Sequence, residues 1–191
     1  MRVMRSPALG LLRVFAFGAV VGAFFDGFHT YGGATSYPDP IALRMAWWTP
    51  PLFGAAFTLL SLTYAAARRS DEDPPPGARR AAGFAAFGAL YFASGFLPAG
   101  NGAKLAVLLV GAAVLFAFVD RSRAAIVAGV ISAIAGPAFE IVLSRLGAFS
   151  HLQPDAMGIP VWLPGLYFAS GPGLGPFVYA LLTRPRSPVA A

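Results

Sequence analysis

The sequence contains no cysteine and has few charged residues. Without cysteine the chain forms neither a disulfide nor a thiolate metal site. Only 12% of its 191 residues are charged, whereas 57% are hydrophobic. A soluble domain carries about 25% charged residues, so this chain has too few polar side chains to cover a surface that faces water. The proportions predict a membrane protein.

Histidine is scarce as well, since only His29 and His151 occur. The chain has no His-Glu-x-x-His zinc motif and no Gly-x-Ser-x-Gly nucleophile motif. Asp26 and His29 share a helix face, but one such pair is too few for a metal site. An acid/base pair could be assembled from Asp26, His29 and His151, yet nothing in their spacing requires it. The sequence therefore predicts no enzyme, no metal site and no cofactor.

Apolar segments of sufficient length for a membrane-spanning helix, about 17–25 residues, occur six times. They cover about residues 8–30, 44–67, 81–98, 103–119, 124–146 and 161–182. The first is too long for a signal peptide and has no cleavage site, so we expect it to be retained. Lys104 is expected to extend from the fourth segment to the membrane interface. The sequence predicts one all-α domain over residues 1–191, a polytopic bundle of six transmembrane helices.

The connector of residues 68–80, RRSDEDPPPGARR, is the only long polar segment, and its three consecutive prolines predict a stiff, exposed linker. If the polar segments alternate between the two sides of the membrane, eleven of the 14 basic residues lie on the side of the N-terminus. These eleven are Arg2, Arg5, Arg13, Arg68, Arg69, Arg79, Arg80, Arg121, Arg123, Arg184 and Arg186. Basic loops stay on the cytoplasmic side, so both termini are predicted to be cytoplasmic. Topology accounts for the net charge of +6, and we expect no nucleic-acid partner.

Proline and glycine interrupt two of the apolar segments. The last segment holds Gly171, Pro172, Gly173, Gly175 and Pro176. Because proline removes a backbone donor and clashes with the preceding turn, we expect this helix to kink or unwind locally. Pro50 and Pro51, after a tryptophan pair, are expected to bend the second helix. The kinks are either purely structural or open a ligand cavity.

Two polar features within the apolar segments, Glu140 and the pair of Asp26 and His29, admit more than one interpretation. Glu140 at membrane depth is a functional-site hypothesis; alternatively, it lies near the outer end and reaches water or Arg145. Asp26 and His29 are expected to cap the first helix in interfacial water. Alternatively, the two side chains pair with each other or form a proton site. Both histidines are expected outside the membrane core.

Gly18 and Gly22, at GxxxG spacing, and other glycine-rich faces favour a homo-oligomer.

Three sequence blocks resemble the Insig family, the insulin-induced-gene membrane proteins. The blocks are AWWTPP at residues 46–51, FVDRSR at 118–123 and WLPGLYFASG at 162–171. Further matches are Gly88, Asn101, Gly147, Pro154 and Asp155. Vertebrate members commonly carry a glutamine early in helix four, where this chain has Ala103 and Lys104. The resemblance extends over the second to the sixth helix, nearly the whole chain.

The resemblance implies six helices with both ends cytoplasmic and a lipid-sensing role. Family members resemble endoplasmic-reticulum receptors for oxysterols that retain an escort protein, Scap. The aspartate of the DRSR block, Asp120 here, is the residue implicated in gripping that partner, so Asp120, Arg121 and Arg123 are candidate partner-binding residues. The alternative is that the two arginines only fix orientation, while Asp120 caps the fifth helix or pairs with Arg123.

The composition, rich in Ala, Arg, Gly and Pro, is typical of a bacterial protein and predicts the inner membrane. We expect one neutral lipid, diacylglycerol-like or sterol-like, in a cavity between the helices. The candidate lipid-binding residues are Phe25, Trp48, Phe92, Asn101, Glu140, Trp162 and Phe168. The alternative function is a small transporter or channel component that uses a broken sixth helix and Glu140.

Overall fold

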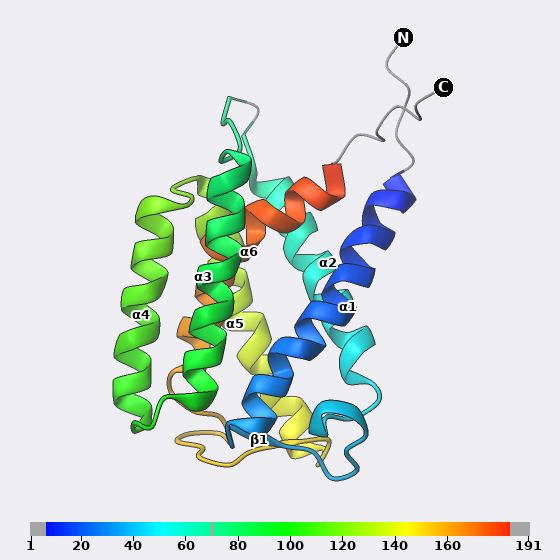
Figure 1. The fold of residues 1–191 in the computed structure, drawn as a ribbon, viewed down its shortest axis with the longest axis vertical. Coiled ribbons are helices and arrows are strands. Elements are labelled where there is room, and N and C mark those ends of the chain that lie inside the picture. The colour runs from blue at the N-terminus through cyan, green and yellow to red at the C-terminus, as the bar shows by residue number, and fades with distance from the viewer. Residues whose placement is uncertain (1–6, 70, 184–191) are drawn as a thin grey trace.

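Six long α-helices make up most of the described part of the chain in the computed structural model (Figure 1). The structure describes residues 7–69 and 71–183. The helices are α1 (Pro7–Tyr31), α2 (Thr49–Ala67), α3 (Gly77–Phe96), α4 (Asn101–Phe118), α5 (Arg123–Arg145) and α6 (Leu163–Thr183). The strands β1 (Thr35–Ser36) and β2 (Ser150–His151) form one short antiparallel pair. The all-α class is therefore confirmed.

The helix ends gather at two ends of the bundle. α1 begins and α6 ends at one of them, which we call the terminal end; β1, β2 and the α3–α4 loop lie at the other, the strand end (Figure 1). By length and composition, four of the helices are able to cross a membrane, namely α1, α2, α4 and α5. That all six helices span, and that the terminal end is cytoplasmic, stay predictions. Of the basic residues in the orientation count, Arg2, Arg5, Arg184 and Arg186 lie outside the described residues.

The second helix begins later than predicted. α2 starts at Thr49 rather than near Arg44, and its prolines stand in the first turn, where a missing backbone N–H costs no hydrogen bond. Just before it, Leu43 and Arg44 have positive φ angles of 53° and 57°, which an α-helix does not contain. Pro50 and Pro51 therefore start the helix, and the prediction that they bend it is wrong.

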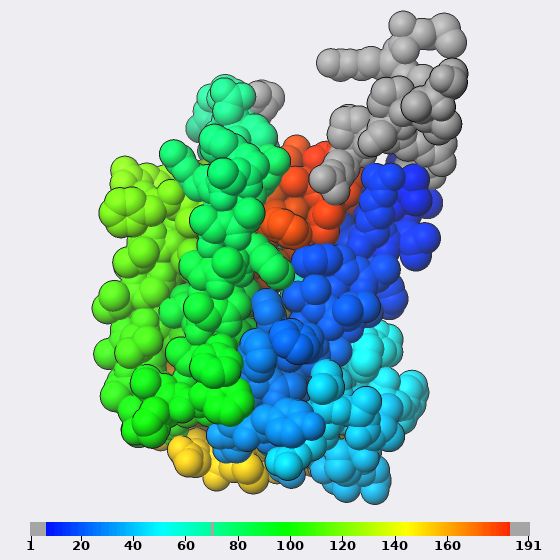
Figure 2. All heavy atoms as spheres, viewed as in Figure 1, coloured from blue at the N-terminus to red at the C-terminus, as the bar shows by residue number. Residues whose placement is uncertain are grey.

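The sixth helix bends without breaking. It is continuous from Leu163 to Thr183 although Pro172 and Pro176 lie inside it, and in Figure 1 its orange half runs steeply while its red half crosses towards α1. α6 contacts all five other helices. On the face of the molecule that Figure 2 shows, α6 is visible only between α3 and α1, near the terminal end. Packing on all sides holds the helix together at its prolines. The kink is confirmed, whereas local unwinding is not.

Glycines allow the helix backbones to approach closely, as expected where lipid surrounds the bundle. Gly171 of α6 faces the Ala125 carbonyl and the Gly129 backbone of α5. Gly18 and Gly22 of α1 face Phe57 and Phe53 of α2. The GxxxG pair of α1 is thus used for packing within the chain, and it gives no argument for self-association.

Candidate functional site

An interior cavity of about 80 Å³ lies between α2, α3, α5 and α6. Its wall is formed by Phe53, Ala56, Phe57, Leu60, Phe87, Tyr91, Ser132, Glu140, Leu163, Leu166, Tyr167 and Ser170. Most of these side chains are apolar, and Glu140 is the one carboxylate among them. Ala56 of α2 is exposed and Ser132 of α5 is half-buried, so the cavity opens towards lipid between these two helices.

Glu140 is fixed by two hydrogen bonds from other elements. The Tyr167 hydroxyl of α6 donates to Oε1 at 2.6 Å, and His151 Nε2 of β2 lies 2.7 Å from Oε2. The side chains of His151 and Glu140 are 1% and 18% exposed. Arg145 is five residues further along α5, on another helix face, so Glu140 does not pair with Arg145. The carboxylate is a satisfied hydrogen-bond acceptor at the wall of a mostly apolar space.

Both histidines are buried within the protein, and that they lie outside the membrane core stays a prediction. His151 belongs to β2, which pairs with Thr35 of β1, and its ring contacts Phe149 and Trp162. The ring of His29 stacks on Tyr91 at 4.3 Å, and its Nε2 lies 2.7 Å from Ser94 Oγ. Because that hydroxyl already donates to the Tyr91 carbonyl, His29 Nε2 is the donor of this bond.

Asp26 is 5% exposed, so it does not cap α1 in interfacial water, and it does not pair with His29. Its partner is the hydroxyl of Tyr37, which donates to Oδ2 at 2.9 Å from the loop after β1. Burial, together with the nearby Asp26, raises the pKa of Tyr37 above its ordinary value. The phenol therefore stays protonated and remains a donor. The strand-end loops supply the polar partners of the helix ends that they cover.

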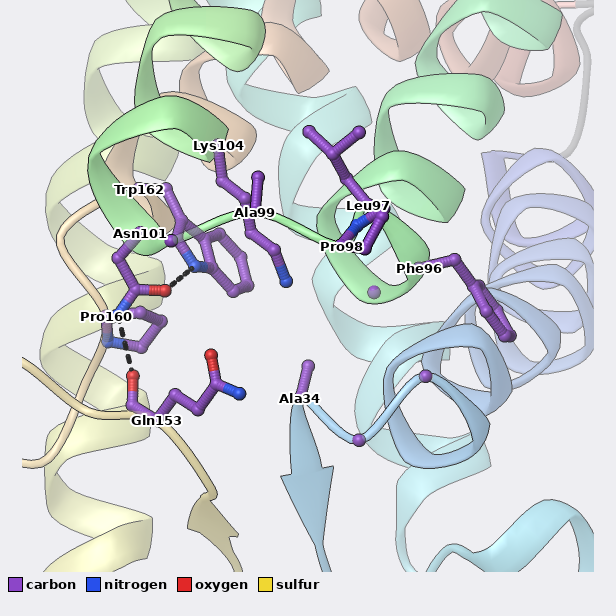
Figure 3. Close-up of a pocket in the computed structure, with 14 residues that line it drawn as sticks. Ala34, Phe96, Leu97, Pro98, Ala99, Asn101, Lys104, Gln153, Pro160 and Trp162 are labelled. Carbon is purple, nitrogen blue, oxygen red and sulfur yellow. Dashed lines mark hydrogen bonds between the residues drawn. The ribbon is translucent and has the colours of Figure 1, made fainter.

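A second pocket, of about 530 Å³, lies at the strand end (Figure 3). Its lining comes from residues 32–34 after α1, the end of α3, the α3–α4 loop, the start of α4, Gln153, Pro160 and Trp162. Asn101 lies in the wall: its Oδ1 accepts from Trp162 Nε1 at 3.0 Å, and its Nδ2 donates to the Gln153 carbonyl at 2.8 Å and to Asp155 at 2.9 Å. We call this space the strand-end pocket.

The side chain of Lys104 extends into the strand-end pocket, and that it reaches the membrane interface stays a prediction. The residue is 7% exposed, and its Nζ donates to the Ser94 carbonyl at 2.9 Å. That carbonyl belongs to the last turn of α3, where a cation is favourable for the helix dipole. The side chain of Lys104 thus joins α4 to α3 and lines the strand-end pocket.

The seven candidate lipid-binding residues lie in several places. Glu140 lines the interior cavity, while Asn101 and Trp162 line the strand-end pocket. Phe25, Trp48, Phe92 and Phe168 line neither pocket. Phe25 packs against Phe87 and Tyr91, Trp48 against Tyr37, Phe92 against Phe96, and Phe168 against Gly129.

Sequence reasoning missed most of the interior wall. On α6 the wall residues Leu163, Leu166, Tyr167 and Ser170 follow the spacing i, i+3, i+4 and i+7, which places them on one helix face. This spacing is present in the sequence and groups Tyr167, not its neighbour Phe168, with the other wall residues, but it does not show that this face borders the cavity. On α2, Phe53, Phe57 and Leu60 show the same spacing.

The DRSR loop has its aspartate inside and its arginines outside. Asp120 is 5% exposed; it accepts from the Tyr64 hydroxyl and, at 3.0 Å, from the backbone N–H of Ser122. Ser122 caps α5 by accepting from Ala125 N, so Asp120 is not the cap. Among the described residues no ion pair joins Asp120 to Arg123. Arg121 and Arg123 are exposed.

No family model matches the sequence, but curated proteins and solved structures do. An INSIG protein homolog of Mycolicibacterium vanbaalenii is 33% identical over 178 residues, 90% of this chain and 84% of the relative. Insulin-induced gene 1 proteins are 27% identical in Cricetulus griseus and 26% in Homo sapiens, each over 172 residues and 86% of this chain. These matches span 67% and 62% of the two relatives, about two thirds of their length.

Two solved structures have the same fold as this chain. One is the crystal structure of MvINS, a mycobacterial Insig homolog from Mycobacterium vanbaalenii, and the other is a cross-linked trimer of an MvINS cysteine variant. Each has a TM-score of 0.82 and 26% sequence identity, and the match covers 98% of this chain and 100% of the other.

Proposed function

The chain belongs to the Insig family, and from this membership we propose that it holds the polar end of one neutral membrane lipid in the interior cavity beside Glu140. It is an integral membrane protein. The observation that carries the proposal is a mostly apolar wall with a single carboxylate, whose oxygens accept from Tyr167 and His151. Apolar sites with few polar groups orient a ligand by its polar end. The proposed role is regulatory and not catalytic.

The cavity favours an uncharged lipid with a small hydroxyl head. Glu140 accepts hydrogen bonds and would repel an anionic head group, and Ser132 and Ser170 add hydroxyls at the same wall. The volume of about 80 Å³ is below the range of about 300–1,000 Å³ for sites that enclose a drug-sized ligand. We therefore place only the head inside, with the tails passing between α2 and α5 into the bilayer. A diacylglycerol-like or sterol-like lipid has this form.

A tryptophan at the opening tests this proposal. Ala56→Trp fills the space beside the cavity, and Leu59→Trp, on the outward face of the same helix where Leu59 is 64% exposed, is the matched control. The indole would occupy the space that the lipid head needs, so we expect Ala56→Trp to reduce co-purified neutral lipid by about tenfold, which corresponds to about 1.4 kcal/mol of binding free energy. Lipid extracted from protein in a neutral detergent is quantified by mass spectrometry. Wild-type protein that carries no lipid, or equal lipid in both variants, would refute the proposal.

The loop of residues 120–123 is the proposed docking point for a cytoplasmic or membrane protein partner. The exposed Arg121 and Arg123 supply the contact, while the buried Asp120 positions the loop by bonding to Tyr64 of α2. Because MvINS forms a cross-linked trimer, a homotrimer is the proposed assembly.

No specific contact supports the alternative that the chain is a transporter or channel component. It required a broken sixth helix, but α6 is continuous. Glu140 is hydrogen-bonded to Tyr167 and His151, and so it is not a free group beside a helix break. We do not propose transport.

A further inference from the structure

The strand-end pocket has one charged lining side chain, the ammonium of Lys104. The residue is 7% exposed, and Figure 3 shows its side chain extending from α4 into the space bordered by Trp162, Ala99 and Ala34. The other lining residues are apolar, glycine or amide residues, with no acidic side chain among them. The pocket of about 530 Å³ lies within the range of about 300–1,000 Å³ for small-molecule sites.

The charge of Lys104 has no counter-ion in the part of the chain that the structure describes. The ion pairs there are Arg69 with Asp71 and His151 with Glu140, so no carboxylate lies within 4 Å of Nζ. The one hydrogen bond of Nζ goes to the neutral Ser94 carbonyl, although an ammonium has three donors. A buried charge without an opposite charge is costly. An anion in the pocket would offset that cost.

The start of α4 adds to the positive potential of the pocket. The Asp155 carboxylate lies at the same helix start, where it accepts from Asn101 Nδ2 and Val161 N, but it does not line the pocket. Gly100 and Asn101 line it, and the N-terminus of a helix carries about half a positive charge. Ala103 N and Lys104 N donate to the Gly100 carbonyl, which leaves the N–H groups of Asn101 and Gly102 without a hydrogen bond among the described residues. Backbone N–H groups at a helix start, together with a lysine, are typical of phosphate sites.

Residues 32–34 after α1 and the end of α3 border the same pocket and bring carbonyl oxygens, which favour a cation. Several of these carbonyls are already bonded: among the lining residues, Ala34 accepts from Leu152 N and Leu97 accepts from Ala99 N. Next to them, the Ser94 carbonyl accepts from Lys104. A full charge on Nζ also exceeds the partial charge of about one half at a helix end. The balance favours an anion.

We propose that the strand-end pocket binds a phosphate group, bonded to Lys104 and to the start of α4. The phosphate comes either from a lipid head group or from a free phosphate compound. This site is separate from the cavity beside Glu140, because the two pockets share no lining residue. The ligand proposed for the cavity is uncharged, whereas the ligand proposed here is an anion.

The test is isothermal titration of the full chain in dodecyl maltoside with inorganic phosphate, with dioctanoyl phosphatidate and with neutral dioctanoylglycerol. Lys104→Gln keeps a donor for the Ser94 carbonyl and removes the charge, and we expect at least about a tenfold loss of phosphate or phosphatidate affinity, the scale of one charge-assisted hydrogen bond. Lys104→Arg should retain most of the affinity. Arg145→Gln, which removes a cation from an exposed position at the same end, should not change it.

A second variant leaves the lysine in place. Ala99→Trp fills the pocket from the α3–α4 loop and should also abolish binding, while the melting temperature reports whether each variant is folded. Binding of inorganic phosphate identifies a free-phosphate site, and binding of phosphatidate alone identifies a lipid head group. Affinities that are equal in wild type, Lys104→Gln and Ala99→Trp would overturn the proposal. Dioctanoylglycerol binding should be unchanged in Lys104→Gln, so failure of this site is distinguishable from failure of the lipid site.

Discussion

Single residues carry most of the polar contacts between helices, and Asp120 is the clearest case. Its carboxylate lies 5% exposed between α2 and the α4–α5 loop, and it accepts from Tyr64, which is 0% exposed. A buried carboxylate that loses a donor keeps its desolvation cost. Asp120 therefore holds the DRSR loop in place, and of its charged side chains only the arginines are exposed.

Removal of the Tyr64 hydroxyl should destabilise the protein. We expect Tyr64→Phe to lower the free energy of unfolding by about 1.5–3 kcal/mol, because a hydrogen bond to a charged group is lost. The free energy is measured by denaturant titration in mixed micelles. Tyr179→Phe is the control: its ring lies 5.5 Å from that of Tyr64, and its hydroxyl has no hydrogen bond in the described part. Equal losses in the two variants would contradict the role of the Asp120 bond.

At the scale of elements, α6 determines how closely the other helices approach. Gly171 faces the backbone of α5 at Ala125 and Gly129. It also precedes Pro172, a position at which a residue with a Cβ is disfavoured in the α region. Glycine meets both requirements, so the bend of α6 and its close packing on α5 depend on the same residue.

A methyl group at this contact should separate the helices. We expect Gly171→Ala to lower the free energy of unfolding by about 1–3 kcal/mol, the cost of overpacking. Gly102→Ala in the first turn of α4, where an added Cβ meets nothing within 4 Å, should be neutral or slightly stabilising. Thermal and denaturant unfolding in the same detergent compare the two. A neutral Gly171→Ala would mean that α5 and α6 are not in backbone contact.

For the whole molecule, the absence of native cysteine makes the orientation directly testable. If six helices cross the membrane and the basic loops are cytoplasmic, the α2–α3 linker and β2 lie on opposite sides. Asp73 and Ser150 are exposed at these two places. We expect Ser150→Cys to react with a membrane-impermeant maleimide in intact cells and Asp73→Cys to react only after lysis. Labelling of both from the same side would show that an even number of spans lies between the two positions, and labelling of Asp73→Cys alone in intact cells would show that the order of sides is reversed.

The sequence by itself determined the membrane class, the all-α fold, the positions of the six helices to within a few residues, and the family. These features depend on composition, on the lengths of apolar segments and on short blocks such as AWWTPP, all of which are local along the chain. The start of α2 was predicted too early because the two prolines were interpreted as a bend, although a proline pair is equally suited to a first helical turn.

The tertiary structure decided which polar groups meet. His29 bonds to Ser94 across 65 residues and Tyr64 to Asp120 across 56, and Glu140 finds His151 through the short pair of β1 and β2. Helical spacing shows which residues share a face, but it does not show which helix that face contacts. In a bundle surrounded by lipid almost every face is apolar, so hydrophobic patterning does not separate inward from outward faces. The partners of Lys104, Glu140 and Asp120 therefore became visible only in the packed bundle.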